Sequence, residues 1–134
     1  MITMSEIESP GKNQTETEYD LENRTLMFTK NIIKFAKNVP LNVVNNEILR
    51  QLIRSSSSIG SNYIEANESL SEKDFMMRIK ICRKEAKETT YWLKVLDLND
   101  QELNKQCNHL YSEATQLKKI FSSIALKSKN KFIY

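Results

Sequence analysis

The amino-acid sequence predicts an all-α protein, an antiparallel up-down-up-down four-helix bundle. The 134 residues include only two glycines and two prolines, far fewer than a turn-rich β sandwich or a glycine-rich nucleotide-binding fold needs. Four segments carry apolar residues at the three- and four-residue steps of one helix face. The breaks between these segments are short, so consecutive helices should lie antiparallel in a single domain.

The first predicted helix covers residues 20–38 and is stopped by Pro40, because proline cannot continue a helix. Its apolar stripe consists of Leu21, Thr25, Phe28, Ile32, Phe35 and Val39. Residues 1–19 lack this periodicity and include the helix breakers Pro10 and Gly11. Residues 1–20 hold five acidic residues and one lysine, hence a net charge of −4. We therefore expect residues 1–19 to be an acidic leader that is disordered or loosely attached.

The second predicted helix covers residues 41–68. Its stripe consists of Leu41, Val44, Ile48, Leu52, Ser55, Ile59, Asn62 and Ala66. The segment 55–62, which reads SSSSIGSN, is poor in helix-forming residues, so a flexible linker is the alternative interpretation. Because the stripe keeps its phase through this segment, we favour a continuous helix whose small side chains let a neighbouring backbone approach closely.

The third predicted helix begins at Ser71, where Asp74 completes a capping box. Its stripe consists of Phe75, Ile79, Cys82, Ala86, Thr89, Leu93 and Leu96. The fourth begins at a cap supplied by Asn99 or Asp100, and its stripe consists of Leu103, Cys107, Leu110, Ala114, Leu117, Phe121 and Ile124. Both stripes alternate steps of four and three residues, as in helical bundles. We place the bundle in residues 20–128 and a C-terminal tail in residues 129–134.

The second and third helices each carry a further apolar face beside the stripe. A helix that is apolar on two sides needs two partners. We therefore predict a contact between subunits of a homo-oligomer, formed by Leu49, Ile53, Ser56, Gly60, Ile64, Met77, Ile81, Trp92 and Val95. Burial of the same residues inside one bundle is the alternative.

The segment from residue 55 to residue 93 carries a series of motifs in a fixed order. The series is Ser58-Ile59-Gly60-Ser61-Asn62, Glu65, Ser71, Asp74-Phe75, Lys80-Ile81, Ala86, Glu88 and Trp92-Leu93. This order resembles that of the four helix bundle proteins, also called 23S rRNA-intervening-sequence proteins. Ala66, Glu85 and Thr90 depart from the family pattern, which usually has a glycine, a small residue and a glutamate at these positions.

The resemblance implies a four-helix bundle that assembles into a ring-shaped homopentamer and is often encoded within an rRNA insertion. The chain is also similar to the accessory proteins of diversity-generating retroelements, which are basic pentamers that bind nucleic acid and a reverse transcriptase. As partners, the resemblance therefore implies further copies of the chain, RNA or DNA, and a nucleic-acid enzyme such as a reverse transcriptase. It implies no settled biochemical activity.

One face of the third predicted helix carries lysines without acids. On a helical wheel, six residues opposite the apolar stripe fall within about 80° of one another. They are Lys73, Lys80, Lys84, Lys87, Tyr91 and Lys94, here called the lysine face. Phosphate groups need only such cations, so we predict that this face binds nucleic acid. A solvated outer surface is the alternative, although unmixed lysine is less usual there than alternating charges.

The sequence offers no catalytic or cofactor site. The sole histidine, His109, lies beside the fourth stripe, and Gln106 stands where a di-iron bundle would need a glutamate. The serines at 55–58 have no neighbouring base to activate them. We therefore expect no enzymatic activity, no cofactor and no metal. Cys82 and Cys107 fall on apolar stripes, which favours reduced core thiols in a cytoplasmic protein, and no apolar stretch is long enough for a membrane span.

These observations leave two hypotheses for function. The one we favour is a non-enzymatic oligomeric scaffold that binds the backbone of RNA or DNA, or a nucleic-acid enzyme, through the lysine face. The alternative is a purely structural or protein-binding helix bundle with no nucleic-acid role. A membrane-surface role is disfavoured because the lysine face lacks the exposed apolar partner face that such binding needs.

Overall fold

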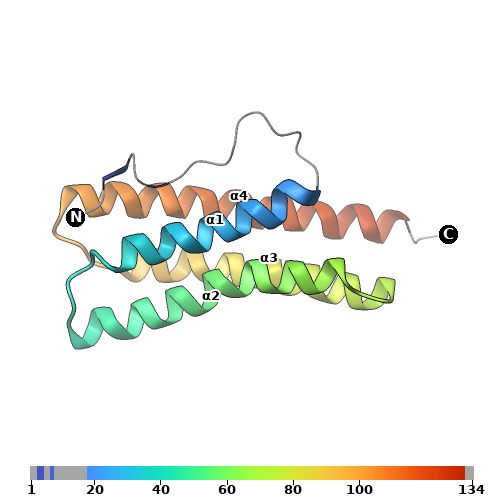
Figure 1. Cartoon of the computed structure of the whole chain (residues 1–134), viewed down its shortest axis with the longest axis horizontal. Coiled ribbons are helices and arrows are strands. Elements are labelled where there is room, and N and C mark those ends of the chain that lie inside the picture. Colours follow the sequence, from blue (N-terminus) through green and yellow to red (C-terminus); the bar gives the residue numbers. More distant parts are fainter. Residues whose placement is uncertain (1–2, 5–6, 8–17, 132–134) are drawn as a thin grey trace.

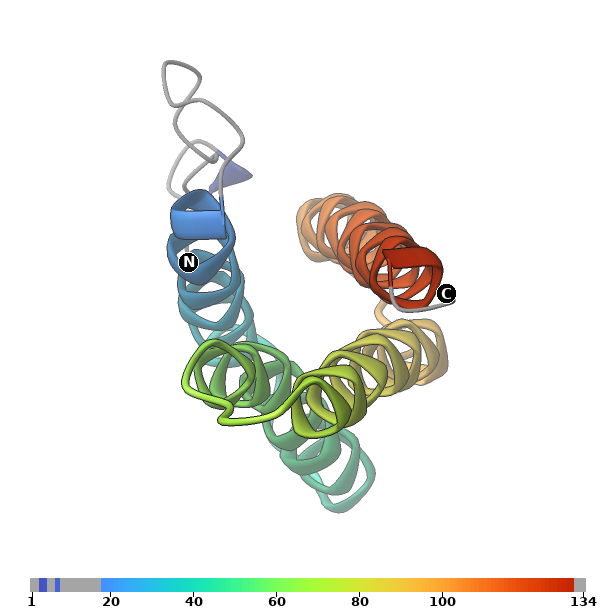
Figure 2. The same cartoon turned by 90° about the vertical axis from the view of Figure 1, so that its right-hand side faces the viewer.

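The computed structural model describes residues 3, 4, 7 and 18–131, and these residues form four long helices. The helices are α1 (Glu18–Ala36), α2 (Val43–Asn67), α3 (Glu72–Val95) and α4 (Gln101–Lys131). Successive helices run in opposite directions, each packs on the next, and α1 also contacts α4 (Figure 1). Viewed along their length, they follow one another in chain order around the bundle (Figure 2). The predicted all-α fold with sequentially packed antiparallel helices is confirmed.

The starts of α3 and α4 are fixed by side chains that accept a hydrogen bond from the backbone three residues further on. Ser71 Oγ accepts from the amide of Asp74 at 3.1 Å, as predicted. Asp100 Oδ1 accepts from the amide of Leu103 at 2.9 Å, so Asp100 rather than Asn99 is the capping residue of α4. Each bond satisfies one of the amides that the first turn of a helix leaves without a partner.

The start of α2 differs from the prediction. The helix begins at Val43 and is capped by Asn42, whereas the sequence pattern placed its start and its first core residue at Leu41. Leu41 and Val44 are 80% and 65% exposed, so neither belongs to the core. The physical reason is the short α1, which ends at Ala36 and leaves the first turn of α2 without a helix opposite.

The predicted acidic leader is described only at a few positions. Ile7 is buried, and the backbone amide of Met4 donates to Glu102 Oε1 at 3.0 Å. At these two positions the segment is held by the hydrogen bond from Met4 to α4 and by the burial of an apolar side chain, and the leader as a whole stays a prediction. Residues 1–2, 5–6 and 8–17 lie outside the described residues.

Both outer boundaries of the bundle are wider than predicted. The first helix begins at Glu18, two residues before the predicted boundary. The last helix ends at Lys131, three residues into the predicted tail, because no glycine or proline follows Ala125 to stop it. Residues 132–134 lie outside the described residues.

The predicted stripes form the core. Buried members from all four helices are Phe28, Ile32, Phe35, Leu52, Ile59, Ile79, Ala86, Leu93, Leu110, Leu117 and Phe121. Cys82 and Cys107 are buried, unpaired thiols, as predicted for core residues. Burial disfavours the thiolate and raises the pKa of Cys82 to about 12 and that of Cys107 to about 11. Both thiols are therefore protonated at neutral pH.

The serine- and glycine-rich segment lies inside α2, so the predicted continuous helix is confirmed. Two of its small residues, Ser56 and Gly60, face α1 of the same chain. A Cβ atom placed on Gly60 would lie 3.1 Å from Thr25 Oγ1, and Thr29 Oγ1 donates to the carbonyl oxygen of Ser56 at 3.2 Å. The absence of large side chains thus lets the two helices approach closely, which offsets the low helix propensity of the segment.

The close contact between α1 and α2 at Gly60 limits the size of the side chain that this position can hold. Replacing Gly60 by leucine should lower the free energy of unfolding by about 1–3 kcal/mol, because the new side chain has to displace Thr25. Ser61→Leu is the matched control, since it adds the same side chain at the next, exposed position and should change stability by less than about 0.5 kcal/mol. Urea denaturation followed by circular dichroism measures both. Equal stability of the two variants would contradict the close approach.

Candidate nucleic-acid interface

The lysine face lies on the outer surface of α3. All six of its residues are exposed: Lys73, Lys80, Lys84, Lys87, Tyr91 and Lys94. Among the described residues, no carboxylate forms an ion pair with any of the five lysines. The structure therefore brings together the residues that the sequence singled out, as a continuous basic strip along one helix.

The two glutamates that flank this strip are directed toward α2. Arg54 Nη1 lies 3.1 Å from Glu85 Oε2, and Nη2 of the same arginine pairs with Glu88. The side chain of Glu85 is only 8% exposed, so its charge is held beneath the surface. Because Arg54 pairs with both acids, it offsets one of their two negative charges, and only one remains to set against the five neighbouring lysines. The glutamate at position 85, which departs from the family pattern, thus has a structural partner.

Further polar contacts fix the register of α3 on α2. Thr89 Oγ1 donates to Ser55 Oγ at 3.0 Å in the buried interior. About three turns nearer the start of α3, Arg78 Nη1 donates to Asn62 Oδ1 at 2.9 Å. The sequence alone does not reveal the Thr89–Ser55 and Arg78–Asn62 pairs, because the partners lie on different helices.

Aromatic side chains border the C-terminal part of the lysine face. Lys94 Nζ lies 5.6 Å from the ring centroid of Tyr111 on α4, a cation–π contact that directs this lysine toward α4. Tyr91 packs edge to face against Trp92 with 5.0 Å between the ring centroids. The lysine face thus carries one exposed aromatic ring among its cations.

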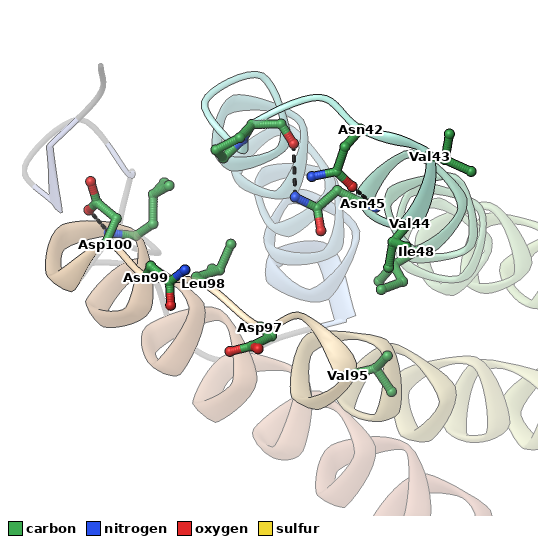
Figure 3. Close-up of a pocket in the computed structure, with 12 residues that line it drawn as sticks. Asn42, Val43, Val44, Asn45, Ile48, Val95, Asp97, Leu98, Asn99 and Asp100 are labelled. Atoms are coloured by element: carbon green, nitrogen blue, oxygen red, sulfur yellow. Dashed lines mark hydrogen bonds between the residues drawn. The ribbon is translucent and has the colours of Figure 1, made fainter.

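A hollow of about 780 Å³ lies at the end of the bundle where α2 and α4 begin (Figure 3). Two of its polar side chains already bind the local backbone: Asn45 Nδ2 donates to the carbonyl oxygen of Pro40 at 2.8 Å, and Asp100 caps α4. Within the described ranges, no group of three or more histidine, cysteine, aspartate and glutamate side chains is arranged to hold a metal ion. The hollow therefore offers helix caps and apolar side chains rather than converging reactive groups.

The residues considered for catalysis are dispersed. His109 is exposed on α4, although Cys107 and Leu110, the stripe residues on either side of it, are buried. The hydroxyls of Ser55 and Ser56 are buried and donate to carbonyl oxygens one turn earlier in α2. Nothing in this arrangement activates a serine.

The structure divides the residues predicted to contact another subunit. On α2, Leu49 and Ser56 are buried by the chain itself and Gly60 contacts α1, so these three belong to the alternative of burial within one bundle. On α3, Ile81 and Trp92 are half-buried. Four apolar residues of the set are exposed and available to a partner: Ile53, Ile64, Met77 and Val95. No helix among the described residues is long and apolar enough to cross a membrane.

The described fold and surface define a class, that of antiparallel four-helix bundle proteins with a basic outer face. Within that class, the model of the 23S rRNA-intervening sequence protein family matches residues 17–123, and the chain belongs to this family. The chain is also similar to the structure of a protein of unknown function from the S23 ribosomal protein family of Bacteroides thetaiotaomicron VPI-5482. The TM-score is 0.68 at 29% sequence identity, covering 81% of this chain and 96% of the other. No curated protein matches the chain.

Arg54, which pairs with both glutamates, should stabilise the fold only while Glu85 is present. Arg54→Met should lower the free energy of unfolding by about 1–3 kcal/mol, because the buried carboxylate of Glu85 loses its partner. The double variant Arg54→Met/Glu85→Ala should recover most of this loss. Chemical denaturation of the wild type, both single variants and the double variant closes the cycle. Purely additive effects would contradict the coupling.

Proposed function

We propose that this protein is a non-enzymatic scaffold that binds the phosphate backbone of RNA or DNA through the lysine face. The observation that carries the proposal is the exposed strip of five lysines on α3, whose two flanking glutamates are both paired with Arg54. An excess of cations over neighbouring acids is what phosphate neutralisation needs, and such contacts are blind to sequence.

The charge distribution of the chain supports this proposal. The whole chain carries +3, and since residues 1–20 carry −4, the remaining residues carry +7. A strip that is locally unbalanced attracts polyanions more strongly than the modest net charge suggests. The similarity to retroelement accessory proteins adds a nucleic-acid enzyme, such as a reverse transcriptase, as a further partner in this proposal.

We further propose that several copies assemble and repeat the lysine face. Two separate apolar strips remain exposed: Ile53 and Ile64 continue the α1-facing stripe of α2, and Met77 and Val95 lie on α3. Two different strips suit a head-to-tail contact, which closes into a ring when the rotation between subunits permits. The ring-shaped homopentamer implied by the family resemblance would have this kind of interface. Repetition of a weak phosphate-binding face raises the total affinity for a long polyanion.

Binding should depend steeply on salt and little on sequence. In a filter-binding series, log K should fall linearly with log salt concentration. Lys84→Gln/Lys87→Gln should make this slope less steep by about 1.4–1.8, because each phosphate contact contributes about 0.7–0.9. Lys30→Gln/Lys37→Gln is the matched control: it removes the same charge from exposed positions on the α1 side and should leave the slope nearly unchanged. Absence of retention at low salt would leave a purely structural bundle as the better function.

The assembly proposal makes its own prediction. Light scattering coupled to size exclusion should show an oligomer for the wild type at micromolar concentration. Ile64→Glu and Met77→Glu should each reduce the mass toward that of one chain, because a charge on either strip has to be desolvated in the contact. These side chains are 52% and 49% exposed, so helix content should not change. Leu126→Glu, at an exposed position on α4, is the control. A monomeric wild type would refute the assembly.

A further inference from the structure

Tyr91 is an exposed aromatic ring in the middle of the cations of the lysine face. The residue is 59% exposed, and Lys87 and Lys94 lie one helical turn before and after it. Lys84 lies on the same line, about two turns before the ring. A large ring in such a position gains little from burial inside the chain, so packing within the bundle does not account for it.

The ring presents an open face. Its partner Trp92 packs at an interplanar angle of 78°, and in such a T-shaped pair at most one face of the tyrosine ring is covered. The indole is itself fixed, because Trp92 Nε1 donates to Glu88 Oε2 at 3.0 Å and Glu88 pairs with Arg54. The tyrosine thus leans on an anchored neighbour and keeps a flat apolar surface toward solvent.

The surrounding charge argues against an apolar protein surface as the occupant of this ring. Covering Tyr91 with another chain would also cover Lys87 or Lys94, and neither has a carboxylate partner among the described residues. Desolvating an unpaired ammonium group is costly. An occupant that offers a flat aromatic surface together with negative charges on both sides satisfies the ring and the lysines at once.

We propose that the lysine face binds single-stranded nucleic acid, with one base stacked on Tyr91 and the adjacent phosphates neutralised by Lys84, Lys87 and Lys94. This inference rests on the proposed function and narrows its ligand class. Aromatic rings in basic grooves bind single strands in this way, because every base has a π face. In a duplex the bases are already stacked on one another, so the ring has no base face to contact and only the lysines contribute.

The test compares Tyr91→Ala, Tyr91→Leu and Tyr91→Phe with the wild type. Fluorescence anisotropy measures binding of a labelled mixed-sequence RNA strand, and of the duplex that it forms with its complement, over a series of salt concentrations. Circular dichroism checks that each variant is folded, as expected for an exposed position. Phenylalanine keeps the ring, whereas leucine keeps apolar surface without a ring.

Tyr91→Ala and Tyr91→Leu should weaken single-strand binding by about 5-fold to 150-fold, the range that one stacked base contributes. Tyr91→Phe should bind like the wild type, and duplex affinity should be the same for all four proteins. The slope of log K against log salt should not change, because no charge is removed. This constant slope distinguishes stacking from the loss of a phosphate contact.

Three outcomes would overturn the inference. Equal single-strand affinity of Tyr91→Ala and the wild type would show that the ring takes no part, while the lysine-based function stands. Equal weakening by Tyr91→Phe and Tyr91→Ala would assign the contact to the hydroxyl rather than to a stacked ring. No binding of strand or duplex by the wild type at low salt would refute the proposed function itself, and the inference with it.

Discussion

The ion pairs of Arg54 with Glu85 and Glu88 determine how the surface of α3 is charged. A carboxylate as buried as that of Glu85 requires a cation close by, since water no longer solvates it. The arginine reaches across from α2, so the pairs connect the two helices and also offset one of the two negative charges beside the outer face. If the glutamates were free, they would compete for the neighbouring lysines. The basic strip is therefore a consequence of how α2 and α3 are packed, as well as of the lysines themselves.

Features that depend on one helix at a time were predictable from the sequence. The stripes of α3 and α4, the cap at Ser71 and the exposure of the lysine face all follow from spacing along a single helix. The continuity of α2 through the serine-rich segment also followed, because the phase of the stripe was preserved there. Each of these predictions needed only the period of a helix and the chemistry of its ends.

Features that depend on which helix packs against a given face could not be predicted from the sequence. The second apolar face of α2 was assigned to another subunit, yet Ser56 and Gly60 contact α1, because the period of a stripe does not identify its partner. Leu41 and Val44 fit the stripe of α2 but lie past the end of α1. The pairing of Glu85 likewise depends on Arg54, thirty-one positions away in the sequence. The sequence therefore predicted the exposed lysine face better than the contacts that support it.

The two buried thiols of the core have a practical consequence for experiments on this protein. The chain contains only two cysteines, and both are buried and protonated in the folded state. Thiol-directed labels react with exposed thiolates, so the native protein offers them almost no target. A single cysteine introduced on the outer surface of α3 would consequently carry a dye or a spin label by itself. The proposed assembly could then be tested through distances between such labels, without first removing the natural cysteines.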